Sequence, residues 1–357
     1  MWGRPRRLAL LAEGRFTPVD AKTAVGVLRY RPEEVAAVID STRAGSTAGE
    51  RAGVGGAVPV LADVAAAAAA GADSLLIGVA PQGGELPTAW RASVLDALAR
   101  GWDVFSGLHA FLADDLEFAA AAARTGARIH DVRRPPARRP VAAGRAAALE
   151  ASVVLTVGSD CNVGKMTAAV EIVRALEARG ERAAFVATGQ TGMFIADQGV
   201  TVDAVPSDFV AGFTEELVLE AARTATFVIV EGQGSLNHPA YSGVALALLH
   251  GACPSLLVLC HHPGRTHLRL AAAPGAFPLP SLAELVEAYE RMSRWIRPAA
   301  VAGIALNTLG LAESRARDAC EDAARETGLP ATDPVRFGAE PLAEALVARR
   351  RDHAPPS

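Results

Sequence analysis

The stretch Gly158-Ser159-Asp160-Cys161-Asn162-Val163-Gly164-Lys165-Met166-Thr167 sets the architecture of the second half of this chain. It follows residues 152–157 (SVVLTV), an apolar run typical of a buried strand, and residues 166–179 continue it as a helix. A glycine-rich turn between a strand and a helix points several backbone N–H groups at one spot, where the helix dipole adds positive potential. The stretch therefore predicts a phosphate-binding loop.

This loop departs from the common pattern G-x-x-x-x-G-K-S/T in two ways. Five residues rather than four separate Gly158 from Gly164, and Met166 stands between Lys165 and Thr167. The wider spacing, with an aspartate inside it, resembles dethiobiotin synthetase and its relatives among P-loop proteins. We expect Lys165 to reach terminal phosphate oxygens and the Thr167 hydroxyl to ligate Mg²⁺ when a nucleotide binds. The alternative is a glycine turn that only packs a helix on a strand, and Lys165 counts against it.

Two later loops are expected to complete the phosphate site. Residues 187–192 (ATGQTG) form either a second anion-binding loop around Gly189 or a tight turn. Asn307 follows the apolar run 301–306, where its amide is placed either to read a base edge or to cap a turn. The expected phosphate- and cofactor-binding residues are Gly158, Ser159, Asp160, Asn162, Val163, Gly164, Lys165, Met166, Thr167, Gly189 and Asn307.

An acidic residue ends another apolar run. Residues 226–230 (TFVIV) are typical of a strand, and Glu231 follows them directly, ahead of Gly232-Gln233-Gly234. Ligands of open α/β sheets gather at the carboxyl ends of strands. We therefore expect Glu231 to act in catalysis with Lys165, and to hold Mg²⁺ with Thr167 if a nucleotide binds. An acid that merely ends a strand is the alternative.

Two histidine-containing loops offer further side chains. Residues 235–242 (SLNHPAYS) place His238 where it suits acid–base catalysis. Residues 260–267 (CHHPGRTH) match no common zinc spacing, and we expect an anion-binding loop there that holds a substrate carboxylate. The expected substrate-binding residues are Gln233, Tyr241 and Arg265.

The length of 357 residues suggests two domains. In the first half, short apolar runs alternate with helical stretches, which is typical of a parallel sheet. Asp40 ends the second run, where a Rossmann fold has its ribose-binding acid, but the turn after the first run (Ala12-Glu13-Gly14-Arg15-Phe16) lacks G-x-G-x-x-G. We expect a Rossmann-like domain that supports the fold or binds substrate. The expected strands are 7–12, 35–39, 75–79 and 102–105, and the expected helices are 61–70 and 89–99.

A proline- and arginine-rich run, residues 132–140 (VRRPPARRP), disfavours helix and separates the two halves. We interpret it as a linker that leads into a helix over residues 142–150. The predicted class is α/β with two parallel-sheet, three-layer domains. They are a Rossmann-like domain over 1–132, a linker and connecting helix over 133–150, and a P-loop NTPase-like domain over 151–350. In the last domain the expected strands are 152–157, 183–187, 226–230, 256–259 and 301–306, and the helices 166–179, 215–225, 282–295 and 315–327.

Composition disfavours several kinds of partner. Only 5% of the residues are aromatic and the formal charge is -4, which argues against nucleic acid. No apolar stretch approaches the ~20 residues that span a bilayer, so no membrane partner is expected. The four cysteines show no CxxC pair, which favours reduced thiols in a cytoplasmic protein. We expect a small-molecule substrate and a homo-oligomer, with the first half as a candidate dimer surface.

The motifs occur together in a recognisable order. GSDCNVGKMT, ATGQTG, VEGQGSLNHPAYSG, LCHHPGRTH and ALNT follow AEGRF, DAKTAVGVLRY, VIDSTRAG, IGVAPQGG and SGLHAFL. This set resembles a family, long catalogued as a domain of unknown function, that pairs a Rossmann-like domain with a P-loop domain. One branch of it acts as D-glutamate N-acetyltransferase. The resemblance implies acetyl transfer from acetyl-CoA to D-glutamate. It carries over the cradle residues Gly158, Gly164, Lys165 and Thr167 together with Glu231, but no catalytic base.

Three functions follow from these residues. The first is an N-acyltransferase in which His238 deprotonates an amino acid and N–H groups at 232–234 stabilise the oxyanion. The second is an ATP- and Mg²⁺-dependent kinase or carboxylate–amine ligase. The third is a nucleotide-binding regulator without turnover. Because CoA carries a pyrophosphate and a 3′-phosphate, the cradle suits either acetyl-CoA or ATP. An oxidoreductase built on the first half is disfavoured by the missing glycine fingerprint.

Overall fold

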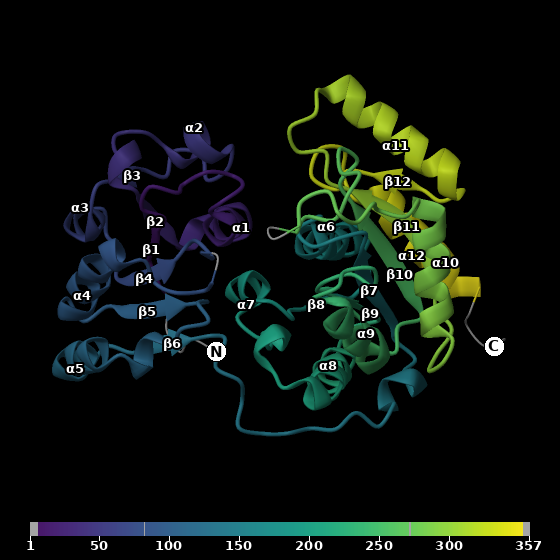
Figure 1. Ribbon diagram of the computed structural model, residues 1–357, viewed down its shortest axis with the longest axis horizontal. Helices are drawn as coiled ribbons and strands as arrows, with labels where there is room; N and C mark the ends of the chain where they lie inside the picture. Colours follow the sequence, from purple (N-terminus) through teal and green to yellow (C-terminus); the bar gives the residue numbers. More distant parts are fainter. Residues whose placement is uncertain (1–5, 82, 271–272, 353–357) are drawn as a thin grey trace. The chain divides into compact units, whose positions relative to one another are not determined.

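The structure is a computed structural model that describes residues 6–81, 83–270 and 273–352. The chain forms two compact units, Met1–Pro136 with Met193–Ala204 and Ala137–Gly192 with Val205–Ser357. Each unit has one six-stranded sheet in which all paired strands are parallel (Figure 1). The predicted α/β class with two parallel-sheet domains is confirmed. Within the described ranges, no helix combines the length and the apolarity needed to cross a membrane.

The sheet of the first unit has the strand order β3-β2-β1-β4-β5-β6. Crossovers between parallel strands are right-handed, so the connections that run in opposite directions along the sheet lie on opposite faces. Accordingly α1 lies on one face and α3, α4 and α5 lie on the other (Figure 1). The elements are β1 (Leu8–Leu11), α1 (Lys22–Tyr30), β2 (Val35–Ile39), α2 (Ala48–Ala52), β3 (Val60–Leu61), α3 (Val64–Ala69), β4 (Ser74–Ile77), α4 (Arg91–Ala99), β5 (Asp103–Ser106), α5 (Leu116–Thr125) and β6 (Ile129–Asp131).

Asp40, at the end of β2, serves the fold of this unit. Its carboxylate accepts hydrogen bonds from the N–H groups of Gly14 and Phe16, both at 3.1 Å, and it pairs with Arg43 at 2.8 Å. The side chain is fully buried. Asp40 therefore closes the turn after β1, the turn in which a dinucleotide-binding Rossmann fold carries its glycine fingerprint.

A segment from the second half of the chain completes the first unit. Helix α7 (Gln190–Ala196) begins in the second unit, and residues 193–204 belong to the first. Asp197 follows α7 with a left-handed backbone (φ 58°), and its carboxylate binds Arg6 at 2.8 Å and Arg31 at 2.7 Å. Thr201 donates a hydrogen bond to the carbonyl of Val132. The chain thus contributes to the first unit twice.

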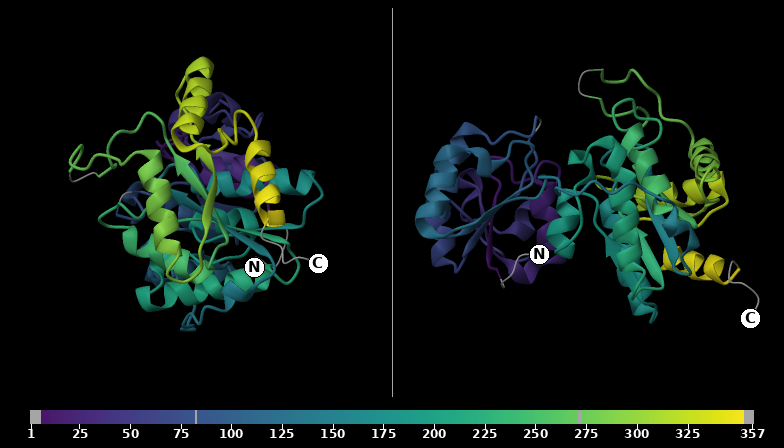
Figure 2. Two further views of the ribbon diagram at one scale, coloured as in Figure 1. Left: turned by 90° about the vertical axis from the view of Figure 1, so that its right-hand side faces the viewer. Right: turned by 90° about the horizontal axis from the view of Figure 1, so that it is seen from below.

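The sheet of the second unit has the strand order β12-β11-β10-β7-β9-β8. Helices α6 and α12 pack on one face, and α8, α9 and α10 pack on the other (Figure 2). The elements are β7 (Ser152–Gly158), α6 (Lys165–Ala178), β8 (Ala183–Val186), α8 (Ser207–Ala221), β9 (Phe227–Val230), α9 (Ser242–Ala252), β10 (Leu256–His261), α10 (Leu282–Ser293), β11 (Ala300–Leu306), α11 (Glu313–Thr327), β12 (Ala331–Thr332) and α12 (Glu340–Asp352). Buried side chains between the sheet and its first pair of helices include Val154, Ile172, Ile229, Val258 and Leu346.

The connecting helix predicted over residues 142–150 is wrong. The structure has only one 3₁₀ turn there, Arg145–Ala148. The buried carboxylate of Glu215, in α8, accepts hydrogen bonds from the N–H groups of Ala143 (3.2 Å) and Arg145 (2.6 Å) and from the Arg145 guanidinium. Because a distant acid takes these N–H groups, the segment has no need of helical hydrogen bonds. Helix α8 itself starts at Ser207, earlier than the predicted 215–225.

Candidate active site

The predicted motifs meet at the carboxyl edge of the second sheet. The strand order places β7, which precedes the glycine-rich loop, between β9 and β10. Glu231 follows β9 and His261 ends β10, so both flank the loop, while Asn307 follows β11 one strand further out. Parallel strands end at the same edge, which is where open α/β sheets bind ligands.

The loop wraps closely around its own lysine. Lys165, the first residue of α6, is buried, and its Nζ donates to the carbonyl of Asp160 at 2.9 Å. A Cβ on Gly158 would lie 2.9 Å from the backbone carbonyl oxygen of Asp160 and 2.8 Å from this Nζ, and Gly164 has a left-handed backbone (φ +101°), so both positions require glycine. Burial lowers the pKa of Lys165, because a desolvated ammonium is disfavoured. The N-terminus of α6 and Lys165 together suit an anion.

Arg265 lies on the loop itself. Its guanidinium donates to the buried Asp160 carboxylate at 2.7 Å and to the Cys161 carbonyl at 2.6 Å. The N–H of Arg269 also reaches Asp160, at 2.9 Å. From the sequence we expected this guanidinium on a substrate carboxylate, whereas here it binds a carboxylate of the protein. Arg265 therefore holds the shape of the loop.

The start of the loop is fixed by three more side chains. Ser159 Oγ lies 2.9 Å from His261 Nδ1, and Asn237 donates to the Ser159 carbonyl at 3.0 Å. Burial is the main reason that the pKa of His261 falls to about 4, so its imidazole is neutral near pH 7.

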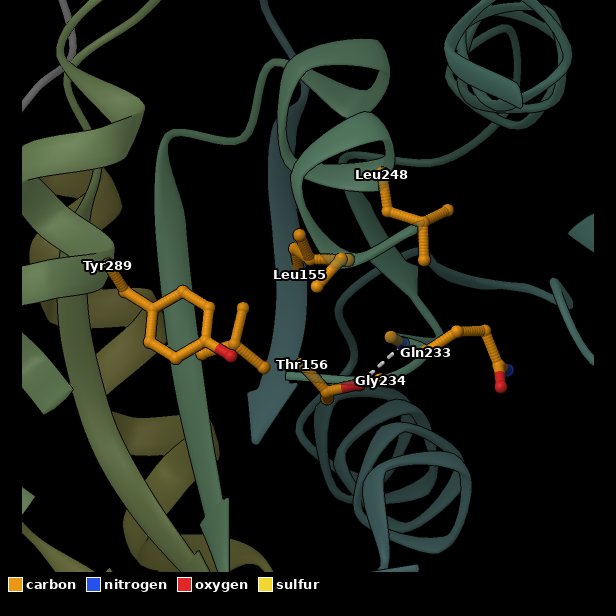
Figure 3. A pocket seen from close by; sticks show the side chains of 9 residues that line it. Leu155, Thr156, Gln233, Gly234, Leu248 and Tyr289 are labelled. Carbon is orange, nitrogen blue, oxygen red and sulfur yellow. Dashed lines mark hydrogen bonds between the residues drawn. The ribbon is translucent and has the colours of Figure 1, made fainter. Parts of the chain in front are cut away.

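Tyr289 is a site residue that sequence reasoning missed. Its hydroxyl comes from α10, donates to the Gly158 carbonyl at 2.8 Å and accepts from the Leu236 N–H at 3.1 Å. The ring is buried and lines a small pocket with Thr156, whose hydroxyl accepts from the Gly232 N–H (Figure 3). The only signal in the sequence was a tyrosine inside the expected helix 282–295. Its role follows from its burial, because buried tyrosine hydroxyls usually have a hydrogen-bond partner.

Glu231 is a buried carboxyl group, only 4% exposed. Its Oε2 accepts from the N–H groups of Thr188 and Gly189, both at 3.1 Å, and a Cβ on Gly192 would overlap it. Burial raises the pKa of Glu231 to about 7, against the opposing effect of these donors, Gln233 and Lys165. A carboxyl group with this pKa can take up and release a proton near neutral pH. Residues 187–192 thus contact the Glu231 carboxylate, and helix α7 starts within this segment, at Gln190.

His238 is 2% exposed and its ring packs against Tyr241 with the centroids 4.6 Å apart. Its Nδ1 accepts a hydrogen bond from the Ala240 N–H at 3.1 Å. In a neutral imidazole with Nδ1 as acceptor, the proton is on Nε2. This tautomer suits a hydrogen-bond donor, whereas from the sequence we expected a base. Tyr241 is half exposed.

The other predicted residues occupy several environments. Gln233 donates to Thr188 Oγ1 at 3.2 Å, on the Glu231 side of the site. Asn307 lies against the loop at Gly164, and its Oδ1 accepts from the Leu309 N–H at 3.2 Å, which matches the turn-capping alternative. In and after the loop, Asn162 is exposed, Val163 is buried, and Met166 and Thr167 are half-buried in the first turn of α6.

One cluster in the described part of the chain has side chains that metals bind. Asp160, Cys161 and His238 each place one such atom within 4.8 Å of the others. However, the Asp160 carboxylate is already bound by the Arg265 guanidinium. That cation competes with a metal ion for the carboxylate and disfavours a metal there.

Comparison with known proteins finds two family domains in this chain and relatives that are similar over most of its length. Residues 140–343 match the family described as "Domain of unknown function (DUF1611_C) P-loop domain", and residues 41–135 match "Domain of unknown function (DUF1611_N) Rossmann-like domain". A D-glutamate N-acetyltransferase of Tritonibacter scottomollicae is 40% identical over 92% of this chain and 94% of its own length. A D-glutamate N-acetyltransferase of a Pseudoalteromonas species is 34% identical over 78% of this chain and 83% of its own.

A solved structure has the same fold over nearly the whole chain. The crystal structure of a DUF1611 family protein from Anabaena variabilis is 39% identical, with a TM-score of 0.91. The match covers 96% of this chain and 99% of that one.

Proposed function

The chain belongs to the DUF1611 family, and from its similarity to two D-glutamate N-acetyltransferases we propose that it is an N-acetyltransferase that moves an acetyl group from acetyl-CoA to D-glutamate. Two identities of 34% and 40% over most of the chain support the transferase class. The acetyl donor and the amino-acid acceptor are our proposal.

The observation that carries the proposal is the buried Glu231. An amino acid is an ammonium ion at neutral pH, and it must lose a proton before its nitrogen can attack a thioester. Glu231, with its pKa raised to about 7 by burial, is matched to that proton transfer. In this mechanism Glu231 is the general base.

The remaining groups of the site stabilise negative charge. The tetrahedral intermediate carries an oxyanion, and the N-terminus of α6 with Lys165 provides donors for it. The Nε2–H of His238 adds a further donor. The same positive region attracts CoA and the carboxylates of glutamate, both of which are anions.

The direct test is an assay of the purified chain. Incubation with acetyl-CoA and D-glutamate should release CoA thiol at a rate that depends on the amino acid, and L-glutamate serves as the matched acceptor of opposite chirality. Absence of thiol release with D-glutamate and with a panel of other amino acids would overturn the proposal.

A phosphoryl-transfer enzyme is the second candidate, because Lys165, Thr167 and Glu231 stand in the order of an ATP site. In that enzyme Thr167 and Glu231 would hold Mg²⁺. Comparing the binding of ATP and of acetyl-CoA, each with and without Mg²⁺, separates the two functions. Mg²⁺-dependent binding of ATP with substrate-dependent formation of ADP would favour the second candidate.

A further inference from the structure

We propose that Cys161, in the glycine-rich loop, accepts the acetyl group from acetyl-CoA as a thioester before the amino acid receives it. The inference rests on the proposed N-acetyltransferase function and adds a covalent intermediate to it. Cys161 would then be a catalytic nucleophile, a role to which its place in the sequence gave no pointer.

The position of Cys161 differs from that of the other three cysteines. It is half-buried in the loop between β7 and α6, whereas Cys253, Cys260 and Cys320 are buried. Burial raises the pKa of Cys260 to about 12, which makes that thiol inert near neutral pH. Cys161 is therefore the thiol that a ligand at the loop can reach.

The surroundings of Cys161 are those of a reactive thiol. Its sulfur lies within 4.8 Å of one imidazole nitrogen of His238 and of one carboxylate oxygen of Asp160. It interacts electrostatically with Lys165, and it stands just before the N-terminus of α6. Helix N-termini and neighbouring cations stabilise a thiolate, which is the nucleophilic form of cysteine.

The negative charge of Asp160 does not cancel this effect. Its carboxylate is bound by Arg265 and by the N–H groups of Arg269 and Cys161, at 2.7, 2.9 and 2.6 Å. The charge of a carboxylate held in this way is offset by the Arg265 guanidinium, so Asp160 opposes a thiolate at Cys161 less strongly. The N–H groups at the N-terminus of α6 remain to stabilise a thiolate or an oxyanion.

The first chemical step exchanges one thioester for another. The Cys161 sulfur attacks the acetyl carbonyl of acetyl-CoA, a bond forms between Sγ and the acetyl carbon, and the bond from that carbon to the CoA sulfur breaks. The proton of the Cys161 thiol ends on the departing CoA thiolate. Because a thioester is consumed and a thioester is made, the step needs no oxidant, reductant or further reactant.

The second step forms the amide. The substrate ammonium gives one proton to Glu231, and its nitrogen attacks the acetyl-Cys161 carbonyl. The bond from carbon to Sγ breaks, and the second proton of the nitrogen passes to the Cys161 thiolate. The products are the N-acetylated amino acid and the free thiol.

This chemistry changes what the loop is expected to hold. The long pantetheine arm separates the pyrophosphate of CoA from its thioester, so both cannot lie at Cys161 together. The nucleophile, the Lys165 ammonium and the base Glu231 all lie near the loop, which places the acyl carbonyl there and the CoA phosphates elsewhere. The loop N–H groups then act as an oxyanion hole.

The experiment is a single-turnover measurement on the full chain with acetyl-CoA and no amino acid. We expect release of one CoA thiol per chain and a mass increase of one acetyl group on the peptide that contains Cys161. Addition of D-glutamate should remove that mass. Acetyl-pantetheine, which lacks the phosphates of CoA, should label the same residue if the loop holds the acyl group.

The matched variants are Cys161→Ala, Cys161→Ser and, as control, Cys320→Ala in α11. The first two should lose the CoA burst and at least 100-fold of the rate, about 2.7 kcal/mol of transition-state free energy, and the control should keep both. Acetyl transfer to D-glutamate by the unchanged chain with no acetyl ever found on Cys161 would overturn the proposal, whatever the variants do. Acetylated Cys161 without transfer to any amino acid would instead support the thioester step and overturn the proposed acceptor.

Discussion

Glu231 is a carboxyl group whose protonation is governed by burial. At the residue scale its sequence position, at the end of an apolar run, marks a ligand-facing acid, but the pKa of about 7 comes from the side chains and backbone packed around it. The tautomer of His238, by contrast, follows from one local backbone hydrogen bond, from Ala240. For Glu231 the partners are distant in the sequence, since Thr188 and Gly189 donate to its carboxylate.

The rate of the proposed reaction should follow the ionisation of Glu231. A general base must be deprotonated, so kcat/KM should rise with pH until it levels above about pH 7. Glu231→Gln should remove this rise and lower the rate by about 10²–10⁴-fold. Initial rates of thiol release between about pH 6 and about pH 8 measure both. A profile that is flat across that range for the unchanged chain would contradict Glu231 as base.

The same substitution should stabilise the fold at high pH. The pKa of Glu231 is raised from 4.5 to about 7, so the folded chain holds this proton more tightly than the unfolded chain. The contribution of Glu231 to stability is fully present below about pH 4.5 and is lost as the pH rises through about 7. The change in unfolding free energy caused by Glu231→Gln should therefore be more favourable at pH 8 than at pH 4, by up to roughly 3 kcal/mol. Denaturant unfolding at the two pH values measures the difference, and an equal effect at both would refute the raised pKa.

At the scale of elements, helix α10 positions loops of the site that lie far from it in the sequence. The buried Tyr289 hydroxyl bridges Gly158, at the end of β7, and Leu236, in the loop after β9. Helix α8 acts similarly through Glu215, which replaces the predicted connecting helix by a hydrogen-bonded turn. In both cases one buried polar group organises backbone from another part of the chain.

Tyr289→Phe should measure that organisation. It leaves the Leu236 N–H and the Gly158 carbonyl without their partner, which should cost about 1–3 kcal/mol of unfolding free energy. Tyr241→Phe is the matched control, since that ring is 49% exposed, and it should cost within about 0.5 kcal/mol. Urea unfolding of the three chains gives the values. Equal stabilities for the two variants would show that the bridge contributes nothing.

At the scale of the whole molecule, the chain does not divide into two consecutive domains. Residues 193–204 return to the first unit after the second unit has begun, and Asp197 anchors them to Arg6 and Arg31. The segment starts within α7, whose first turn lies beside Glu231.

Asp197→Ala should loosen this segment. It removes both ion pairs and places alanine at a left-handed position (φ 58°), where aspartate and asparagine are tolerated better. We expect a loss of about 1–3 kcal/mol and faster cleavage of residues 193–204 by a protease. Asp197→Asn keeps the preference for a left-handed backbone. Its stability and its rate of cleavage should therefore lie between those of the unchanged chain and those of Asp197→Ala. Unchanged cleavage in Asp197→Ala would mean that the ion pairs do not hold the segment.

Most strands and helices were predictable from residue patterns alone. The run 35–39 is β2 itself, and the strand, glycine loop and helix around residues 152–179 occur as the pattern predicts. The α/β class and the gathering of Glu231, Gly189 and Lys165 at one sheet edge follow from the same patterns. They depend on short-range backbone geometry and on the rule that parallel strands end at one edge, which need no knowledge of distant contacts.

What the patterns could not supply is which distant group each side chain meets. Arg265 donates a hydrogen bond to Asp160, and Tyr289 donates one to the Gly158 carbonyl. Glu215 accepts hydrogen bonds from the segment that was predicted to be helical. The glycine-rich loop, from which the fold was inferred, shows the same division. Its glycines and lysine are visible in the sequence, but the closeness of Cys161 to His238 arises only when the sheet brings their loops together. Burial and partner choice depend on that long-range packing, and with them the charge state of each group.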